Sequence, residues 1–266
     1  MKSYRKLYRI RKKKSIFKNR FFWLAILILI AITSLFYIIS FSSFFQIKEI
    51  RISGNSQIQE QELKNKIENK ISRKLFFTET KSIFLVDLKG IKSSVLEFFP
   101  KIEKLEIKRG FFDSLKIEIK ERDPVAVFRQ GEKYFLTDSN GFVFEETISA
   151  GSYFIIENQN LYSEIKPGEQ AVFEEIFSQI INIKNNLIEE LNISSVAVVI
   201  ISDQRVNFET ADGWEIYFNL KGDLNWQMSA LDALLENKIP PENRKNLKYI
   251  DLRFNKIYVS PEGILD

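Results

Sequence analysis

A chain of 266 residues, with 45% hydrophobic and 28% charged side chains, has room for one or two folded domains of roughly 150 residues each. It contains no cysteine and no histidine, which excludes disulfides, cysteine metal sites, thiol nucleophiles, His-based catalytic triads and HExxH zinc sites. The net charge of +4 is unevenly distributed, because residues 1–20 hold ten Lys and Arg and no acid, and the rest of the chain holds 29 basic and 35 acidic side chains.

An uncharged run follows the basic segment. Residues 21–41 read FFWLAILILIAITSLFYIISF, which as a helix is about 31 Å long and matches a hydrocarbon core of about 30 Å. A cleavable signal peptide would have a shorter apolar region and small residues at its exit, where this chain has Phe41, Phe44 and Phe45. The sequence predicts a basic cytoplasmic tail at 1–20 and one transmembrane helix at 21–43, with the C-terminal part extracytoplasmic by the positive-inside rule. The basic run needs no nucleic acid to explain it, although a weak contact with phosphates or a cytoplasmic partner stays open.

The next part of the chain, 44–123, predicts five elements in the order β, α, α, β, β. Alternation favours an opening strand from Phe45 that stops at the turn Ser53–Asn55, and apolar residues four apart favour a helix after it. A second helix starts near Asp87 and ends at Pro100, and two alternating strands follow, joined by a hairpin at 110–113. The apolar positions are Phe45, Ile47, Ile50, Ile52; Leu63, Ile67, Ile71; Leu88, Ile91, Val95, Phe98 or Phe99; Ile102, Leu105, Ile107; and Leu115, Ile117, Ile119.

This order, directly after a single membrane span, resembles the POTRA domain of the FtsQ/DivIB bacterial cell-division proteins. The resemblance rests on IKEIRISGN, on SIFLVDLKGIKSSVLEFFPKIEKLEIKR and on LKIEIKERDPVAVF, and it continues through KYFLTDSNGFVFEE and YIDLRF to nearly the whole chain. It implies a second, β-rich domain of the FtsQ/DivIB type after the POTRA domain.

The remaining residues, 124–266, show the periodicities of an α+β domain independently of any family. They predict a mixed, mainly antiparallel sheet with helices packed on one face. One helix is expected at about 172–191 and a second in DLNWQMSALDALLENK, capped by Asp223 or Asn225. The expected strands are 125–129, 133–137, 142–145, 153–157, 196–202, 205–209, 214–219, 249–254 and 256–260.

Candidate catalytic or metal-binding groups have simpler structural explanations. The adjacent pairs Glu174/Glu175 and Glu189/Glu190 diverge by about 100° on a helix and are typical of solvated faces, and a third pair is Glu145/Glu146. The turn 138–141 resembles a calcium loop but lacks the remaining ligands, which favours a hairpin. The sequence therefore predicts no catalytic residue, no metal and no cofactor.

Binding is the chemistry that the sequence favours. The last strands come late in the chain, where a position at the sheet edge is easy to reach, and an unpaired edge can accept a partner strand. Arginine and large aromatic residues are common at interface hot spots. The alternative is that these residues only alternate into and out of a core. The resemblance implies that this segment docks the single-span partner FtsB (DivIC), which brings FtsL with it, through Tyr249, Asp251, Leu252, Arg253 and Phe254.

The predicted function is therefore a non-enzymatic, single-pass membrane protein of the division septum that recruits partners of the FtsB/DivIC and FtsL type, with no nucleic acid or small-molecule substrate. Two alternatives stay open: a membrane-anchored cell-wall enzyme, and a POTRA-bearing secretion or assembly factor, whose expected companion is a C-terminal membrane β-barrel.

Overall fold

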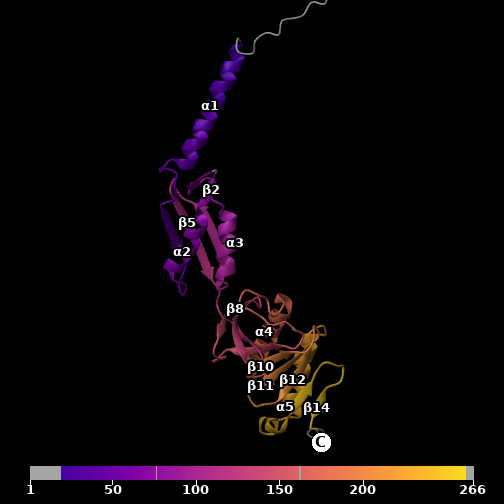
Figure 1. Cartoon of the computed structure of the whole chain (residues 1–266). Coiled ribbons are helices and arrows are strands. Elements are labelled where there is room, and N and C mark those ends of the chain that lie inside the picture. The colour runs from indigo at the N-terminus through magenta and orange to yellow at the C-terminus, as the bar shows by residue number, and fades with distance from the viewer. Residues whose placement is uncertain (1–18, 76, 162, 262–266) are drawn as a thin grey trace, which may run out of the picture. The chain divides into compact units, whose positions relative to one another are not determined.

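The computed structural model describes residues 19–75, 77–161 and 163–261, so the predicted basic tail lies almost entirely outside the described residues. Its first element is the helix α1 (Arg20–Phe41), labelled in Figure 1. The helix begins where the Asn19 side chain accepts a hydrogen bond from the Phe21 N–H at 3.0 Å. With 22 residues and a mean hydropathy of 2.7, α1 is long and apolar enough to cross a membrane. Nearly all its side chains are exposed, which suits a helix that anchors the chain in lipid.

The described residues divide into two compact units. One unit holds residues 19–53, 58–75, 77–92 and 106–118, and the other holds residues 54–57, 93–105, 119–161 and 163–261.

A three-stranded sheet in the order β1-β5-β4 follows α1. Its strands and the two helices between them confirm the predicted β-α-α-β-β order: β1 (Glu49–Ser53), α2 (Glu60–Ile71), α3 (Leu88–Phe98), β4 (Ile102–Arg109) and β5 (Ser114–Glu121). Strand β1 runs parallel to β5, from the pair Glu49 and Ser114 to the pair Ser53 and Glu118. The small hairpin of β2 (Arg73–Leu75) and β3 (Thr78–Thr80) is not predicted by the sequence, because RKLFFTET has no clear alternation.

The apolar stripes behave as predicted in this part of the chain. Helix α2 buries Leu63, Ile67 and Ile71, which lie one turn apart on one face. The Asp87 side chain accepts a hydrogen bond from the Gly90 N–H at 3.0 Å and so caps the start of α3. The opening strand begins later than expected, at Glu49, because the residues from Phe45 onward are bonded to the end of α1 and to the segment after β3.

The second sheet has nine strands in the order β14-β13-β12-β11-β10-β9-β6-β7-β8. The pairs β6/β9, β9/β10 and β12/β13 are parallel and the others antiparallel, which confirms a mixed, mainly antiparallel sheet. The strands are β6 (Ala126–Gln130), β7 (Lys133–Thr137), β8 (Val143–Thr147), β9 (Phe154–Asn158), β10 (Ser195–Ile200), β11 (Arg205–Thr210), β12 (Glu215–Asn219), β13 (Tyr249–Asp251) and β14 (Tyr258–Ser260).

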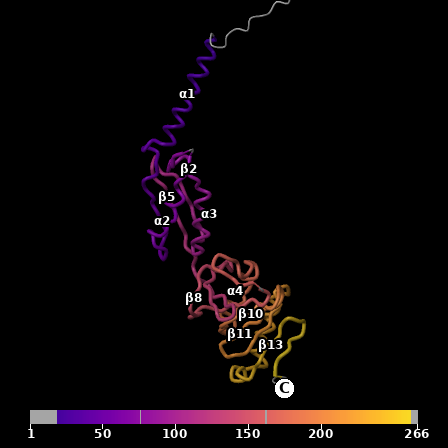
Figure 2. Tube along the Cα trace, in the orientation of Figure 1, coloured from indigo at the N-terminus to yellow at the C-terminus, as the bar shows by residue number. Residues whose placement is uncertain are grey.

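The strand registers align one apolar row across this sheet. The row consists of Phe135, Phe128, Ile156, Val198, Phe208, Ile216 and Ile250, from β7 to β13. All seven residues belong to one buried core, to which α4 (Glu174–Glu189) and α5 (Leu224–Asn237) also contribute. The trace in Figure 2 shows α4 beside β10. Both helices therefore cover the same face of the sheet, as predicted. Asp223 rather than Asn225 caps α5, since its carboxylate accepts from the Trp226 N–H at 3.0 Å.

Candidate protein-binding site

The predicted segment Tyr249–Phe254 forms β13 and the turn after it. Strand β13 is hydrogen-bonded on both sides, to β12 and to β14, so it has no free backbone edge. The helix α5 and the 3-10 helix η2 (Pro241–Asn246) form the connection between β12 and β13. This connection returns the chain to the start of β12, so that β13 runs parallel to it. Among the described residues, the outer strand at this end of the sheet is β14, and the open edge therefore belongs to Tyr258–Ser260.

Asp251 and Arg253 form the charged centre of the site. The Arg253 guanidinium donates to both carboxylate oxygens of Asp251, from Nε to Oδ1 at 2.8 Å and from NH2 to Oδ2 at 2.6 Å, and the Arg253 backbone N–H donates to Oδ1 at 3.1 Å. Asp251 is buried and the Arg253 side chain is 24% exposed. These hydrogen bonds raise the pKa of Arg253 above its usual range, against the opposing effect of burial. The arginine predicted to meet a partner is thus held by its own chain.

Tyr217 and Tyr249 stack beside this ion pair, with ring centroids 5.0 Å apart and planes at 13°. They alternate with the core residues Ile216 and Ile250, so they lie on the sheet face opposite to the helices. The guanidinium carbons of Arg205 and Arg253 lie 4.8 Å and 5.6 Å from the centre of the Tyr217 ring. Burial, together with a hydrogen bond to Glu215, raises the pKa of Tyr217 to about 12.

Leu252 and Phe254 have different surroundings from the charged pair. Leu252 is 1% exposed and belongs to the core, so it acts in the fold. Phe254 is 52% exposed and meets Tyr258, which is 48% exposed, at 6.0 Å edge to face. Phe254 also lines a hollow of about 310 Å³ together with Trp226 at the start of α5.

The structure therefore adds Tyr217, Trp226 and Tyr258 to the predicted residues. Their aromatic type was visible in the sequence, but the position of Tyr217 depends on the pairing of β12 with β13, that of Tyr258 on the pairing of β13 with β14, and that of Trp226 on the placement of α5. Tryptophan, tyrosine and arginine are the residues that most often dominate binding energies at protein interfaces. This surface, which consists of Tyr217, Trp226, Tyr249, Arg253, Phe254 and Tyr258, is called the aromatic edge below.

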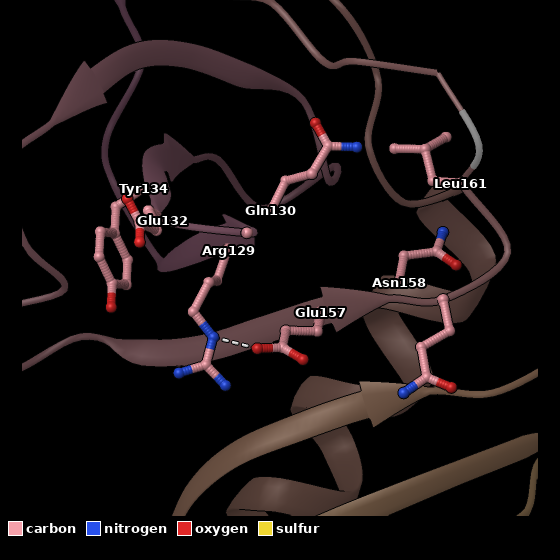
Figure 3. A pocket seen from close by; sticks show the side chains of 9 residues that line it. Arg129, Gln130, Glu132, Tyr134, Glu157, Asn158 and Leu161 are labelled. Carbon is pink, nitrogen blue, oxygen red and sulfur yellow. Dashed lines mark hydrogen bonds and ion pairs between the residues drawn. The ribbon is translucent and has the colours of Figure 1, made fainter.

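A second, larger hollow of about 500 Å³ lies beside β6, β7 and β9. Figure 3 shows Arg129 and Glu157 joined by an ion pair, with Tyr134 and Gln130 around them. The Arg129 guanidinium is therefore already neutralised, and the rest of the lining includes amides, the Tyr134 ring and the carboxylate of Glu132. In residues 19–75, 77–161 and 163–261, His, Cys, Asp and Glu form no group of three or more that could hold a metal ion.

The fold is that of a membrane-anchored α+β protein with two domains. It has an apolar helix, a small domain with β-α-α-β-β order, and a large mixed sheet with the aromatic edge. Comparison with known families identifies the class. Residues 45–122 match the POTRA domain of FtsQ type, and residues 126–253 match the C-terminal domain of the cell division proteins FtsQ/DivIB. The chain belongs to the FtsQ/DivIB family, as the sequence patterns predicted.

The chain is similar to several cell division proteins named DivIB. It is 27% identical to that of Clostridium tetani over 150 residues, which are 56% of this chain and 51% of the relative. It is 31% identical to that of Clostridium acetobutylicum over 102 residues, 38% of this chain and 37% of the relative. It is 22% identical to that of Macrococcus caseolyticus over 248 residues, 88% of this chain and 74% of the relative. The chain thus spans about half or less of the two clostridial relatives.

Proposed function

We propose that this protein is a non-enzymatic component of the cell-division machinery that holds single-span partners of the FtsB/DivIC and FtsL type. The proposal places its N-terminus in the cytoplasm, its C-terminus outside, and the protein in the cell membrane at the division septum. The proposal is supported by the family, by α1 and by the strongly basic segment before it. By recruiting these partners, the protein would couple septal cell-wall synthesis to division.

The proposed binding of a partner is supported by a difference between the two edges of the nine-stranded sheet, β8 and β14. At the β8 edge, the Gly168 N–H donates to the Val143 carbonyl at 2.8 Å, and the Val143 N–H donates to the Glu169 carbonyl at 2.9 Å. A loop of the chain therefore covers the start of that edge, and Glu145 and Glu146 place charges further along it. At the other end of the sheet, β14 has no further strand neighbour in the described part of the chain.

A partner segment can add a strand to β14 and so take part in the sheet. The backbone of the added strand would contribute much of the affinity, and side chains on one face would contribute selectivity. The exposed rings of Phe254 and Tyr258 lie next to this edge and offer apolar contacts to such a segment. Truncation of a hot-spot ring costs about 2 kcal/mol or more, which is roughly thirtyfold in affinity.

The test measures binding of an FtsB/DivIC-type peptide to the full chain in detergent. Phe254→Ala and Tyr258→Ala are expected to weaken binding roughly thirtyfold if each ring is a hot spot. Phe173→Ala is the matched control, because Phe173 is an exposed phenylalanine of the same unit at 75% exposure that precedes α4. Unchanged affinity in both folded edge variants would remove this edge from the proposal.

Orientation is tested separately from partner binding. A reporter that is active only outside the cytoplasm, fused after Asp266, is expected to be active, and protease added to spheroplasts is expected to digest the C-terminal part. Complete protection of that part would contradict the proposed topology, whatever the binding assay shows.

A further inference from the structure

Five phenylalanine rings gather just after α1 ends. Phe44 contacts Phe45 and Phe112 at centroid distances of 5.1 Å and 4.8 Å, Phe45 contacts Phe84 at 5.4 Å, and Phe111 contacts Phe112 at 4.0 Å. These five residues are called the phenylalanine cluster. Although they contact one another, Phe44, Phe84 and Phe111 are 55%, 53% and 81% exposed. The cluster is therefore an apolar surface, and large exposed apolar surfaces in soluble proteins mark interaction sites.

The phenylalanine cluster is fixed to the end of the membrane helix. The Gln46 side-chain amide donates to the Ser40 carbonyl at 2.9 Å, and the Ser82 hydroxyl donates to the Ile39 carbonyl at 2.7 Å. Carbonyls in the last turn of a helix have no partner within the helix, so these side chains cap α1 with groups from the same unit. The cluster follows this junction directly, since Phe44 and Phe45 come three and four residues after Phe41, the last residue of α1. It cannot move far from the plane at which α1 leaves the bilayer.

Backbone strain at the hairpin between β4 and β5 gives an independent indication. Phe112 has φ +55°, a left-handed conformation that glycine and asparagine adopt readily and a bulky residue adopts rarely. Its neighbour Phe111 is the most exposed ring of the cluster. Strained conformations of this kind persist where the surrounding structure imposes them, and they are frequent at functional sites. Two consecutive exposed aromatic residues at a strained turn are difficult to explain by the stability of the unit alone.

A cation lies at the same junction. Lys81 is exposed and stands next to Ser82, the residue that caps α1, and its carbonyl accepts a hydrogen bond from the Ile47 N–H at 3.0 Å. An ammonium at this position is suited to the phosphate groups of lipids, and aromatic side chains are suited to the boundary between head groups and acyl chains.

We propose that the phenylalanine cluster inserts into the head-group region of the bilayer that α1 spans, and that it holds the first unit against the membrane surface. Lipid is the occupant, because the cluster begins three residues after the end of α1, and Gln46 and Ser82 of the same unit are hydrogen-bonded to the last turn of that helix. The inference requires α1 to span a membrane, but it does not depend on any partner of the aromatic edge.

The absence of cysteine makes a site-specific test possible. Phe111→Cys and, as a second position, Phe84→Cys are labelled with an environment-sensitive fluorophore in the full chain. The proteins are reconstituted in vesicles of phosphatidylcholine and phosphatidylglycerol that contain lipids with a quencher near the head group. Glu62→Cys is the control, since Glu62 is exposed on the first turn of α2, near the opposite end of β1 from the cluster.

Insertion predicts blue-shifted emission and several-fold stronger lipid quenching at positions 111 and 84 than at position 62. Phe44→Ser in the Phe111→Cys background is expected to reduce that quenching, while the melting temperature stays the same. Equal quenching at all three positions would overturn the proposal. Protection of position 111 from a water-soluble quencher without quenching by lipid would also overturn it, because a protein surface would then cover the cluster.

Discussion

Arg253 is the residue of the aromatic edge whose removal has the clearest structural cost. In Arg253→Ala, the buried Asp251 carboxylate loses two charged hydrogen bonds and keeps only the bond from the backbone N–H of residue 253. Breaking a fully buried ion pair costs about 3–5 kcal/mol. Here the guanidinium is 24% exposed and one hydrogen bond survives, so we expect a loss of about 2–3 kcal/mol in the free energy of unfolding.

The assay is thermal unfolding of the full chain in detergent, followed by tryptophan fluorescence. Trp214 is 1% exposed in the same unit and reports its unfolding. At about 2–4 °C per kcal/mol for a chain of this size, Arg253→Ala should lower the midpoint by about 5–10 °C. Arg205→Ala is the matched control: Arg205 also stacks on Tyr217, but its side chain donates a hydrogen bond to the neutral amide oxygen of Asn207.

A double-mutant cycle isolates the pair itself. Asp251→Asn combined with Arg253→Ala should cost clearly less than the sum of the two single changes, because the neutral amide does not leave a buried charge. Additive effects, or a midpoint shift for Arg253→Ala no larger than that of Arg205→Ala, would refute the reasoning. The same melts decide whether a loss of partner binding in Arg253→Ala reflects the interface or the fold.

Three further predictions concern single contacts. In a urea titration, Gly54→Ala should lower the free energy of unfolding by about 2–3 kcal/mol, because Gly54 has φ +85° and a Cβ would lie 2.0 Å from the Ile119 carbonyl oxygen. Gly213→Ala is the control and should cost only about 1 kcal/mol, because Gly213 has φ +88° but a Cβ there would lie in open space. The pKa of Tyr217 is raised from 10.0 to about 12, so its neutral form stabilises the fold fully below pH 10, and this stability is lost as the pH rises toward 12. In Tyr217→Phe, the free energy of unfolding measured by denaturation should therefore decrease less between pH 10 and pH 12. Ser82→Ala should remove about 1 kcal/mol and speed amide hydrogen exchange at residues 42–46, whereas Thr33→Ala, which loses only hydrogen bonds within α1, should leave that exchange unchanged.

The elements that the sequence predicted well are those with a long, regular period. Residues close in the chain determine each of these features: the apolar stripe of α2, the Asp87 cap of α3 and the strands of the second sheet. The hairpin β2/β3 was missed because its six strand residues carry no alternation. The opening strand was placed too early, since Phe45 alternates with Ile47 but belongs to the junction with α1.

The sequence predicted the segment that forms the candidate site but not the residues that lie beside it in the fold. Tyr249–Phe254 was expected to be a strand near an edge, and β13 occupies the second position in the sheet. Its neighbours depend on the return of the chain through α5, which brings Tyr217 beside Tyr249 although they are far apart in sequence. The partner of Arg253 was also unexpected: its carboxylate comes from Asp251, the last residue of β13, two residues earlier in the chain.

These placements separate the roles of neighbouring residues in one short motif. Asp251 is buried and accepts three hydrogen bonds from Arg253, so its first effect is to fix the turn that leads from β13 to Phe254. Leu252 alternates into the core and has no surface to offer a partner. Phe254 is half exposed beside the open edge and can offer its ring to a partner. A partner that binds this segment would therefore contact the Phe254 ring, whose position depends on the Asp251–Arg253 ion pair. Substitution of Asp251 or Arg253 would weaken binding indirectly, because it would change the conformation of the turn that carries Phe254.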